Sequence, residues 1–506
     1  MGWEQIYEQW KNHQQLEAGL KDQLTELEKD PEMLQDAFYM PLEFGTAGMR
    51  GILGPGINRM NIYTVRQATE GLARFMDTQD PETRRRGVAI AYDSRHFSPE
   101  FAMEAAKTLA KHDIPAFVFE SLRPTPELSF AVRYLHTFTG IMITASHNPA
   151  AYNGYKVYGE DGGQMPPADA DALTAFVREI ENPLEIPVLS EEEAKHSGLI
   201  TIIGEEVDTA YLKEVKTVTI DQKLIETTGK NLKLVYTPLH GTGRMLGEKA
   251  LKQAGFEQFI IEPSQAVADP NFSTVKSPNP EEHSAFEYAI ALGEKEDADL
   301  LIATDPDADR LGAAVRMPDG NYQVLTGNQL GALMIRYILE AHKNAGTLPE
   351  NAAVLKSIVS SELPTAIAQS YDVEMVNVLT GFKFIAEKIQ QYETDHSHTF
   401  MFGFEESYGY LVKPFVRDKD AIQALVLLAE VAAFYKQSDK TLYDGLQDIF
   451  EEYGYYAEKT ISVTMSGMEG AAKITALMKT RIDKSWFRWS HAKNDYTTVR
   501  CIEIYS

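Results

Sequence analysis

Cysteine is almost absent from this sequence, with Cys501 the single one among 506 residues. A lone thiol cannot form an internal disulfide, which favours a protein of the reducing cytoplasm. Long apolar runs are missing too, and none approaches the roughly 20 residues of a membrane-spanning helix. Residues 1–6 lack a basic region followed by an apolar core, so no signal peptide is expected. Together these absences predict a cytoplasmic protein.

Positive charge is scarce, because 48 Lys and Arg face 74 Asp and Glu, for a net charge of −26. Such an excess argues against nucleic acid and anionic membrane as partners. An acidic protein that binds an anionic small molecule must gather its basic residues locally. The hydrophobic fraction of 44% and the charged fraction of 24% are typical of a soluble globular protein. The length predicts three or four domains.

A serine follows the apolar run 141–143, which predicts the end of a buried strand. Residues 144–158 read Thr-Ala-Ser-His-Asn-Pro-Ala-Ala-Tyr-Asn-Gly-Tyr-Lys-Val-Tyr, and the Asn-Pro and Asn-Gly pairs mark a turn. A tight turn after a strand exposes the hydroxyl of Ser146, which suits a nucleophile or a phosphoryl carrier. His147 and Lys156 supply proton handling and positive charge nearby. An ordinary polar loop is the alternative for a lone Ser-His pair.

Two further segments carry chemistry. Residues 44–51, Phe-Gly-Thr-Ala-Gly-Met-Arg-Gly, form a glycine-rich loop that can present N–H groups and Arg50 to a phosphate, although a flexible turn is an equal alternative. Asp305, Asp307 and Asp309 follow the apolar run 300–303 at alternate positions. Three close carboxylates require a cation, and hard oxygen ligands suit Mg²⁺. An EF-hand is excluded, since it needs Gly and Glu where Arg310 and Arg316 stand.

Strands and helices are expected to alternate along most of the chain. Three segments repeat the plan strand, turn, helix, strand, which predicts three consecutive α/β domains. Ser98 is expected to cap the first of these helices, and residues 3–39 to form one or two helices. The Gly-bearing turn 237–243 has a structural role, because its spacing misses the dinucleotide fingerprint by one residue. The repeated segments are 87–119, 232–261 and 353–378.

These motifs resemble the α-D-phosphohexomutase family over roughly residues 40–480. The similarity rests on the serine stretch, the glycine-rich loop, Thr304-Asp-Pro-Asp-Ala-Asp-Arg310, and two sugar loops at 378–383 and 403–409. It implies a phosphorylated Ser146 in the resting enzyme and Mg²⁺ held by that serine with Asp305, Asp307 and Asp309. It also implies a set of substrate contacts, namely Arg50, Arg310, Thr380, Gly381, Glu405, Ser407 and Lys419.

The implied activity interconverts glucose 1-phosphate and glucose 6-phosphate through a 1,6-bisphosphate, with glucose 1,6-bisphosphate as activator. Arg50, His147 and Lys156 are unranked candidates for handling the protons. Mannose or pentose phosphates are alternative substrates, and a monomer or weak dimer is expected. One rival is an aspartyl-nucleophile enzyme of the haloacid dehalogenase type, in which Asp305 would be phosphorylated. The other is a non-catalytic sugar-phosphate binder.

The expected organisation is a helical extension, three α/β domains around a cleft and a truncated fourth domain. The fourth domain of the family carries a phosphate loop of the type Arg-x-Ser-Gly-Thr-Glu-Pro, and nothing here matches it. Residues 481–506 hold more Lys and Arg than Asp and Glu, and no sustained helical or strand period follows Thr480. The truncation is expected to weaken substrate retention and catalysis. The predicted boundaries are 1–40, 41–207, 208–322, 323–445 and 446–506.

Overall fold

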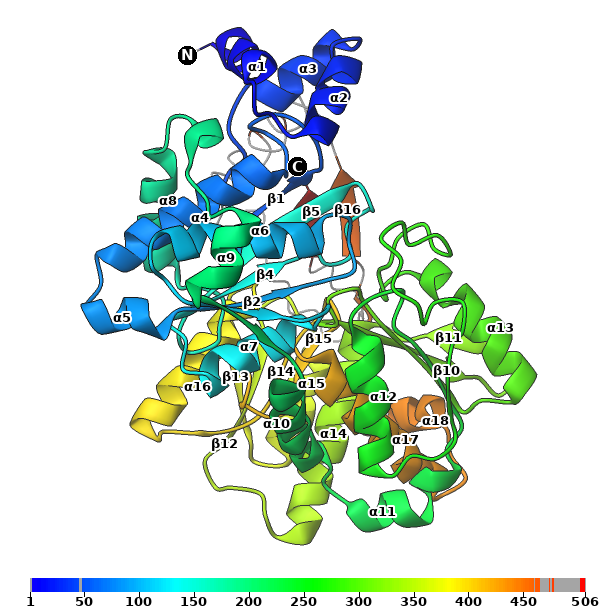
Figure 1. Ribbon diagram of the computed structural model, residues 1–506. Coiled ribbons are helices and arrows are strands. Elements are labelled where there is room, and N and C mark those ends of the chain that lie inside the picture. The colour runs from blue at the N-terminus through cyan, green and yellow to red at the C-terminus, as the bar shows by residue number, and fades with distance from the viewer. Residues whose placement is uncertain are drawn as a thin grey trace.

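A computed structural model describes residues 2–44, 48–458, 460–464, 473, 476 and 501–505. Three larger sheets follow one another along the described chain, and helices cover their faces (Figure 1). This arrangement confirms the predicted succession of three α/β units. No helix in the described ranges is long and apolar enough to cross a bilayer.

The first unit is built on a six-stranded sheet of order β1-β5-β4-β2-β3-β6. Its central strands β2 and β4 are buried along their whole length, which explains their uninterrupted apolar sequences. β4, β2, β3 and β6 are parallel, while β5 and β1 close one edge in antiparallel register. The strands are β1 (Met49–Ile52), β2 (Val88–Tyr92), β3 (Ala116–Phe119), β4 (Thr139–Ile143), β5 (Tyr152–Tyr158) and β6 (Ile200–Ile203). The helices are α4 (Ile62–Asp77), α5 (Pro81–Arg86), α6 (Ser98–Lys111), α7 (Thr125–Tyr134), α8 (Pro167–Arg178) and α9 (Glu191–Ser197).

The second unit has a five-stranded sheet of order β11-β10-β9-β7-β8. β9 is buried throughout and runs parallel to β7, so it delivers the residues after Thr304 to the carboxyl edge of the sheet. The strands are β7 (Leu234–Thr237), β8 (Phe259–Ile261), β9 (Leu300–Thr304), β10 (Leu311–Arg316) and β11 (Tyr322–Val324). The helices are α10 (Glu205–Val215), α11 (Gln222–Thr227), α12 (Gly243–Ala254) and α13 (Glu287–Glu296).

The third unit has a four-stranded sheet of order β13-β12-β14-β15. Its helix α17 is buried along nearly its whole length, which explains the long run of apolar residues in its sequence. The strands are β12 (Ala352–Ser357), β13 (Glu374–Val378), β14 (Thr399–Glu405) and β15 (Gly409–Leu411). The helices are α14 (Gly327–Ala345), α15 (Leu363–Ser370), α16 (Lys383–Asp395), α17 (Ala421–Lys436) and α18 (Leu442–Tyr453).

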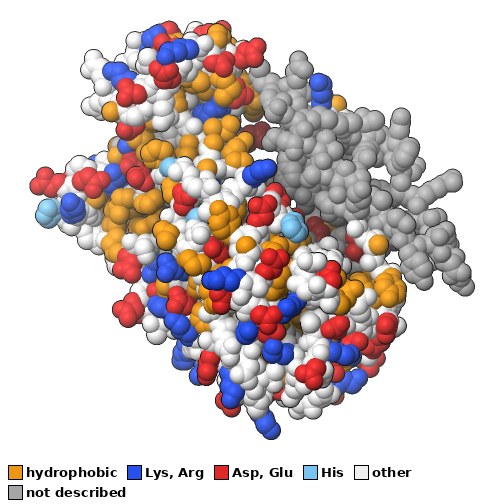
Figure 2. Space-filling view, turned by 90° about the vertical axis from the view of Figure 1, so that its right-hand side faces the viewer, with side chains coloured by type: hydrophobic (Ala, Val, Ile, Leu, Met, Phe, Trp, Pro, Cys, Tyr) orange, Lys and Arg blue, Asp and Glu red, His pale blue; other side chains and the backbone are white. Residues whose placement is uncertain are grey.

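One hydrophobic core joins the three units. It contains Phe119 of the first unit, Leu246 and Ile302 of the second, and Val354 and Leu425 of the third. Separate clusters fill the other face of the first sheet and the other face of the second. On the face shown in Figure 2, acidic and basic side chains are interspersed, with hydrophobic groups between them. The shared core therefore fixes the units against one another.

The N-terminal region forms three helices where one or two were expected. They are α1 (Trp3–Asn12), α2 (Ala18–Leu27) and α3 (Pro31–Phe38), at the top of Figure 1. Glu17 caps α2 through its side chain, and Asp30 caps α3 just before a proline, so two local start signals divide the region. Trp10 packs edge-on against Phe38 and Tyr63, which fixes the helices to the first unit.

The prediction that Ser98 caps α6 is wrong. Ser98 is the first residue of the helix, and the capping position is Phe97, with no side-chain cap. The Ser98 hydroxyl instead donates to Asp93 Oδ1 at 2.8 Å and accepts from Asn153 Nδ2 at 2.9 Å. The amide of Asn153 thus occupies the acceptor side of the hydroxyl, which a helix cap would have used.

The predicted domain boundaries stay predictions. Most of the expected fourth domain, 446–506, and its phosphate loop lie outside the described residues. Two strands in this stretch are described, β16 (Thr460–Thr464) and β17 (Cys501–Tyr505), and they pair in parallel. β17 corrects the expectation of no strand after residue 480, because Cys-Ile-Glu-Ile-Tyr alternates apolar and polar positions and is rich in β-branched and aromatic types.

Candidate active site

The serine loop, residues 144–152, leaves the carboxyl end of β4. Ser146 is buried, contrary to the expected exposure of its hydroxyl, because the acidic loop lies against it, and it adopts a left-handed backbone with φ of +52°. This conformation is uncommon for residues other than glycine and costs on the order of 1 kcal/mol. The amide of Ser146 donates to Thr144 Oγ1 at 2.8 Å, which helps to hold the turn. The loop thus fixes the direction of the serine side chain.

Arg95 holds the serine loop from behind and was missed by the sequence analysis. Its guanidinium is buried and donates to the carbonyls of Ser146 at 2.6 Å and Pro149 at 2.9 Å, and to two more loop carbonyls, those of Asn148 and Tyr152. Asp93 lies 3.3 Å from Arg95 Nε. Burial raises the pKa of Asp93, and the Arg95 charge opposes the rise. The signal for this clamp was the triplet Asp-Ser-Arg at 93–95, with an acid and a base directly after a buried strand.

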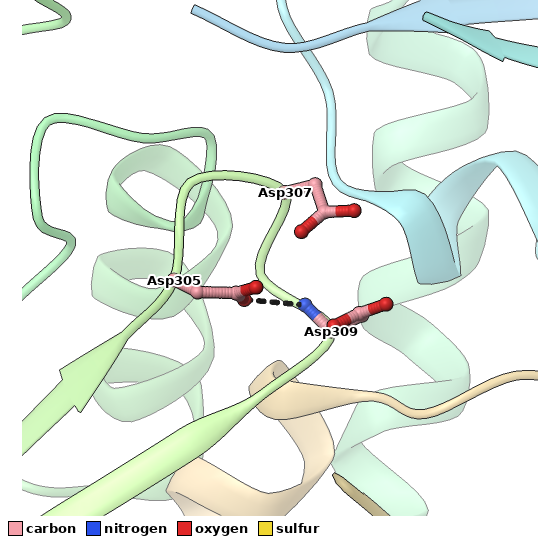
Figure 3. Close-up of side chains that lie close together, drawn as sticks. All are labelled: Asp305, Asp307 and Asp309. Carbon is pink, nitrogen blue, oxygen red and sulfur yellow. Dashed lines mark hydrogen bonds between the residues drawn. The ribbon is translucent and has the colours of Figure 1, made fainter. Parts of the chain in front are cut away.

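The acidic loop, residues 305–310, follows β9. One oxygen from each of Asp305, Asp307 and Asp309 lies within 4.8 Å of the others, and all three side chains are buried. Asp305 Oδ1 accepts the amide of Asp309 at 3.1 Å (Figure 3) and the amide of Arg310 at 3.0 Å. The glycine-bearing turn supports this loop, since Thr242 donates its amide to Pro306 O at 2.8 Å. The expected structural role of that turn agrees with this contact.

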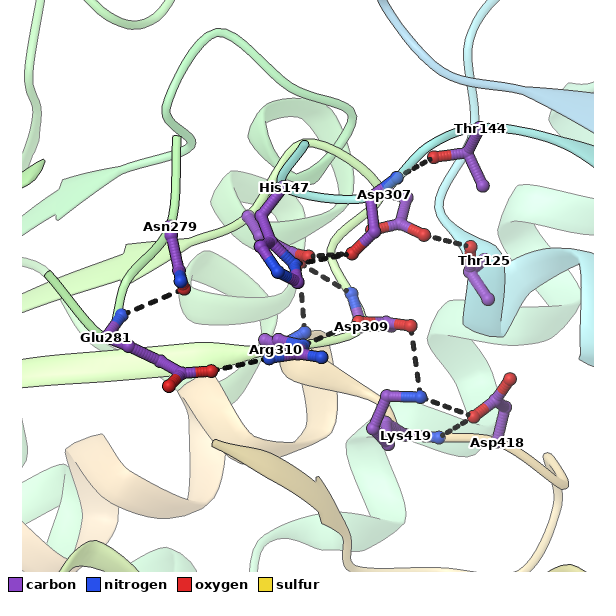
Figure 4. A network of polar contacts seen from close by, with 12 residues as sticks. Thr125, Thr144, His147, Asn279, Glu281, Asp307, Asp309, Arg310, Asp418 and Lys419 are labelled. Atoms are coloured by element: carbon purple, nitrogen blue, oxygen red, sulfur yellow. Dashed lines mark hydrogen bonds and ion pairs between the residues drawn. The ribbon is translucent and has the colours of Figure 1, made fainter. Parts of the chain in front are cut away.

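Two lysines face the acidic loop, and Figure 4 shows one of them, Lys419. Lys156 Nζ lies 3.0 Å from Asp307 Oδ2, and Lys419 Nζ lies 3.1 Å from Asp309 Oδ2. Burial raises the pKa of Asp305, and the neighbouring aspartates raise it further. Burial opposes ionisation of Asp307 too, but the Lys156 charge and its hydrogen bond bring the pKa of Asp307 below its usual range. The lysines therefore neutralise only part of the carboxylate charge.

The aspartates could hold a metal ion. Within the described chain, Asp307 Oδ1 and Asp309 Oδ1 are buried without any hydrogen-bond partner. A buried carboxylate oxygen without a partner is costly, and a cation would remove that cost. The donor set consists of hard carboxylate oxygens, which Mg²⁺ prefers. The expected Mg²⁺ thus fits the residues present.

The serine loop and the acidic loop meet at one hydrogen bond. Ser146 Oγ donates to Asp305 Oδ2 at 2.9 Å, although 159 residues separate them. His147 Nδ1 lies 3.1 Å from the same hydroxyl. Burial lowers the pKa of His147 well below its ordinary value, and the charges of Arg310 and Arg50 lower it further. The imidazole beside the serine is therefore neutral at neutral pH and able to accept a proton.

Arg310 lies at the end of the acidic loop, as expected. Its Nη1 donates to Glu281 Oε1 at 2.5 Å, and the amide of Glu281 donates to Asn279 Oδ1 at 3.1 Å (Figure 4). The Pro-rich segment 277–281 thus positions this guanidinium. Arg50 is exposed on β1 and donates to Asn148 Oδ1 at 2.8 Å, which brings it to the serine loop.

The third unit contributes the two predicted sugar loops. Glu405 ends β14, is buried, and accepts the amide of Gly381 at 2.8 Å, so the two loops touch. Burial raises the pKa of Glu405. Thr380 is exposed and Ser407 is half-buried. Lys419, bound to Asp418 at 3.0 Å, links this unit to the acidic loop.

The structure thus brings most of the predicted residues together, with a few exceptions. Ser146, His147, Lys156, Asp305, Asp307, Asp309 and Lys419 form one continuous network. Thr380 and Ser407 make no side-chain hydrogen bond to that network within the described chain. Residues 45–47 of the glycine-rich loop lie outside the described residues.

Comparisons with known proteins agree with this fold. The phosphoglucomutase/phosphomannomutase α/β/α domains I, II and III match residues 41–184, 209–318 and 326–453. The phosphoglucomutase of Staphylococcus aureus is 42% identical over 445 residues, which cover 88% of this chain and 78% of that protein. These matches define a phosphohexomutase, an enzyme of the isomerase class. The chain belongs to the phosphoglucomutase/phosphomannomutase family.

Solved structures show the same fold. Parafusin, a phosphoglucomutase from Paramecium in its open form, has a TM-score of 0.64 at 17% identity, covering 87% of this chain and 80% of that one. A phosphoglucomutase/phosphomannomutase family protein from Burkholderia thailandensis has a TM-score of 0.62 at 17% identity, covering 81% of this chain and 80% of that one.

Proposed function

We propose that this enzyme interconverts glucose 1-phosphate and glucose 6-phosphate, with Ser146 as the phosphoryl carrier. The observation that carries the proposal is the 2.9 Å hydrogen bond from Ser146 Oγ to Asp305 in a buried aspartate cluster. A carrier hydroxyl beside a cation site is the arrangement that phosphoryl transfer needs, because charge must be offset at the transferring group. The 42% identity to a phosphoglucomutase supports glucose as the sugar.

Asp305, Asp307, Asp309 and the phosphate on Ser146 would hold Mg²⁺. When bound, the ion offsets the negative charge of the transferring phosphoryl group. Lys156 and Lys419 already contact Asp307 and Asp309, so they fix these carboxylates from the outer side. A phosphoserine adds about −1.5 to −2 charges, which makes the cation and the lysines necessary together.

The transfer exchanges one phosphorus–oxygen bond for another. The bond from phosphorus to Ser146 Oγ breaks, and a bond to the free sugar hydroxyl forms. The sugar hydroxyl gives up its proton, and Ser146 Oγ takes one. His147, whose neutral imidazole lies 3.1 Å from Oγ, is placed to take the serine proton when the serine accepts a phosphoryl group, and the imidazolium so formed returns that proton when the serine gives the group up. Arg50 and Lys156 remain candidates on the sugar side.

The resulting 1,6-bisphosphate turns in the cleft and returns its other phosphate to Ser146. Glucose 1,6-bisphosphate would therefore activate the enzyme by phosphorylating the serine. Arg50, Arg310 and Lys419 are proposed to contact the phosphates. Glu405 and Ser407 would bind ring hydroxyls, with Thr380 and Gly381 beside them.

Phosphopeptide mapping tests the carrier. After incubation with glucose 1,6-bisphosphate and Mg²⁺, one acid-stable phosphate is expected on Ser146, none in Ser146→Ala, and an unchanged yield in Ser197→Ala, a control far from the site. An acid-labile phosphate on Asp305 would instead favour the haloacid dehalogenase chemistry. A chain that takes up no phosphate and turns over no hexose phosphate would be a binder only.

A coupled assay tests the substrate. Glucose 1-phosphate is expected to give a higher kcat/KM than mannose 1-phosphate or a pentose 1-phosphate. A preference for either of the other two would keep the mechanism and change the sugar.

A further inference from the structure

A half-buried lysine lies far from the proposed active site and lacks a counter-charge. Lys413 follows β15, and burial lowers the pKa of its amine. In the described part of the chain no carboxylate forms an ion pair with it, although acidic residues outnumber basic ones by 26. The buried lysines of the active site differ, because Lys156 and Lys419 each contact an aspartate. A desolvated cation without a counter-ion is costly, which suggests that an anion belongs beside it.

A cavity of about 180 Å³ opens beside Lys413. Its walls are mostly apolar and come from the segment before α11, from α14, and from the start of β14; they include Ile220, Ile338, Phe400 and Met401. The volume is below the roughly 300–1,000 Å³ of pockets for drug-sized ligands, so only a small molecule fits.

His342 also lines this cavity. Its Nδ1 lies 2.8 Å from Thr347 Oγ1, and in the described structure its Nε2 has no hydrogen-bond partner. Burial lowers the pKa of His342, and the charge of Lys413 lowers it further, so the two groups are close enough to interact. An anion between them would favour the protonated forms of both.

The backbone of Lys413 is held in place before any ligand binds. Its backbone amide donates to Gln423 Oε1 at 2.7 Å, and its carbonyl accepts from Gln423 Nε2 at 3.3 Å. Gln423 is completely buried on α17. A side chain that starts from a fixed backbone loses less freedom when it binds a ligand.

We propose that this cavity binds a small carboxylate with an apolar body. The single ammonium of Lys413 matches one negative charge, and apolar walls favour a hydrocarbon over the hydroxyls of a sugar. The cavity lies at the Thr399 end of β14, whereas Glu405 ends that strand at the active site. Six residues at about 3.3 Å each separate the two by roughly 20 Å, so this is a second site rather than part of the first.

Benzoate is the probe, and its neutral isostere benzamide is the ligand control. Calorimetric titration of the full chain is expected to show benzoate binding and no benzamide binding. Lys413→Met keeps the apolar stem and should weaken benzoate by about tenfold to hundredfold, the value of a charge-assisted contact. Lys413→Arg should retain binding within about tenfold, and Lys388→Met, at a half-buried lysine on α16 that does not line the cavity, should leave it unchanged.

Two further readouts complete the test. Binding should tighten as the pH falls and His342 takes up a proton, and His342→Gln should remove that dependence. Because Ser146 lies outside the cavity, Ser146→Ala should bind benzoate normally, which separates this site from the proposed catalysis. The proposal would be overturned if benzoate did not bind to the native chain. It would also be overturned if Lys413→Met, with the same melting temperature as the native chain, bound benzoate equally well.

Discussion

The serine loop and the acidic loop meet at one hydrogen bond, yet they are built in opposite ways. In the serine loop, Arg95 satisfies four backbone carbonyls, and the backbone is held in a single uncommon conformation. In the acidic loop, Asp307 and Asp309 each keep a buried oxygen that has no hydrogen-bond partner in the described chain. The polar backbone groups of the serine loop have hydrogen-bond partners, which fixes the direction of the Ser146 hydroxyl. The acidic loop keeps carboxylate oxygens without such partners, and a cation can bind to them. Position and charge are thus supplied by different units of the chain.

Removing the hydroxyl should have the largest effect. Ser146→Ala is expected to lower steady-state mutase activity by about a thousandfold or more, because no carrier remains. The fold should persist, since the loop is held by Arg95 and not by the serine hydroxyl. Coupled assays and the melting temperature measure the two effects. Retention of more than a few per cent of activity would show that Ser146 is not the carrier.

The second-largest loss of activity is expected when the contacts of Arg95 with the serine loop are weakened. Arg95→Lys keeps the charge but cannot reach four carbonyls, so the serine should lose its fixed direction and activity should fall by roughly a hundredfold. Arg86→Lys is the matched control, because Arg86 also donates to loop carbonyls, those of His136 and Thr137, away from the site. Equal kcat/KM in Arg95→Lys and Arg86→Lys would show that Arg95 does not fix the direction of Ser146.

A substitution in the acidic loop should alter the Mg²⁺ requirement of the enzyme. Asp307→Asn removes one anionic ligand, and the Mg²⁺ concentration for half-maximal activity is expected to rise about tenfold or more. Titration of activity against Mg²⁺ measures this. Asp297→Asn, which removes an exposed partner of Arg316, should not respond. An unchanged Mg²⁺ dependence in Asp307→Asn would remove the aspartates from the metal site.

A buried carboxyl group outside the active site, that of Glu127, can be compared with the aspartates of the acidic loop. Glu127 on α7 also has two oxygens without a hydrogen-bond partner in the described chain, although Arg123 Nε lies 3.6 Å from one of them. Burial raises the pKa of Glu127 well above its ordinary value near 4.5, and the Asp208 carboxylate raises it further. The folded state therefore holds a proton that the unfolded state releases above about pH 4.5, so this group makes stability fall as pH rises toward the folded pKa.

Glu127→Gln should remove that loss. Its melting temperature is expected to decline less between pH 5 and pH 8 than that of the native chain, by roughly 2–4 °C. Glu120→Gln is the control, because exposed Glu120 contacts the same Arg123 at 3.4 Å. Identical pH profiles for all three proteins would mean that Glu127 is ionised in the folded protein.

The sequence predicted the parts of the site that are local. Asp305, Asp307 and Asp309 lie within one turn, and Ser146 follows an apolar strand directly, so spacing and resemblance were sufficient. Arg95 was missed because its acceptors lie 51–57 residues away and are brought to it only by the pairing of β2 with β4. Lys413 gave no signal either, since its lack of a counter-charge depends on three segments that only the fold brings together.

The same limit explains the wrong cap at Ser98. The local pattern Ser-Pro-Glu is a good helix start, but Asn153, 55 residues away, donates to the hydroxyl where a helix N–H would. Local rules hold where no buried polar group lies across the fold, and they fail where one does.

The burial of α17 has a consequence for the order in which the chain can fold during synthesis. Leu425 of α17 packs beside Gly247 of α12, yet α17 begins about 170 residues after α12 ends. At the usual 5–20 residues per second, the ribosome needs roughly 10–35 seconds to supply that partner. During this time the apolar side of the second unit has no cover, so chaperones that shield exposed apolar surface are expected to bind the nascent chain in this interval.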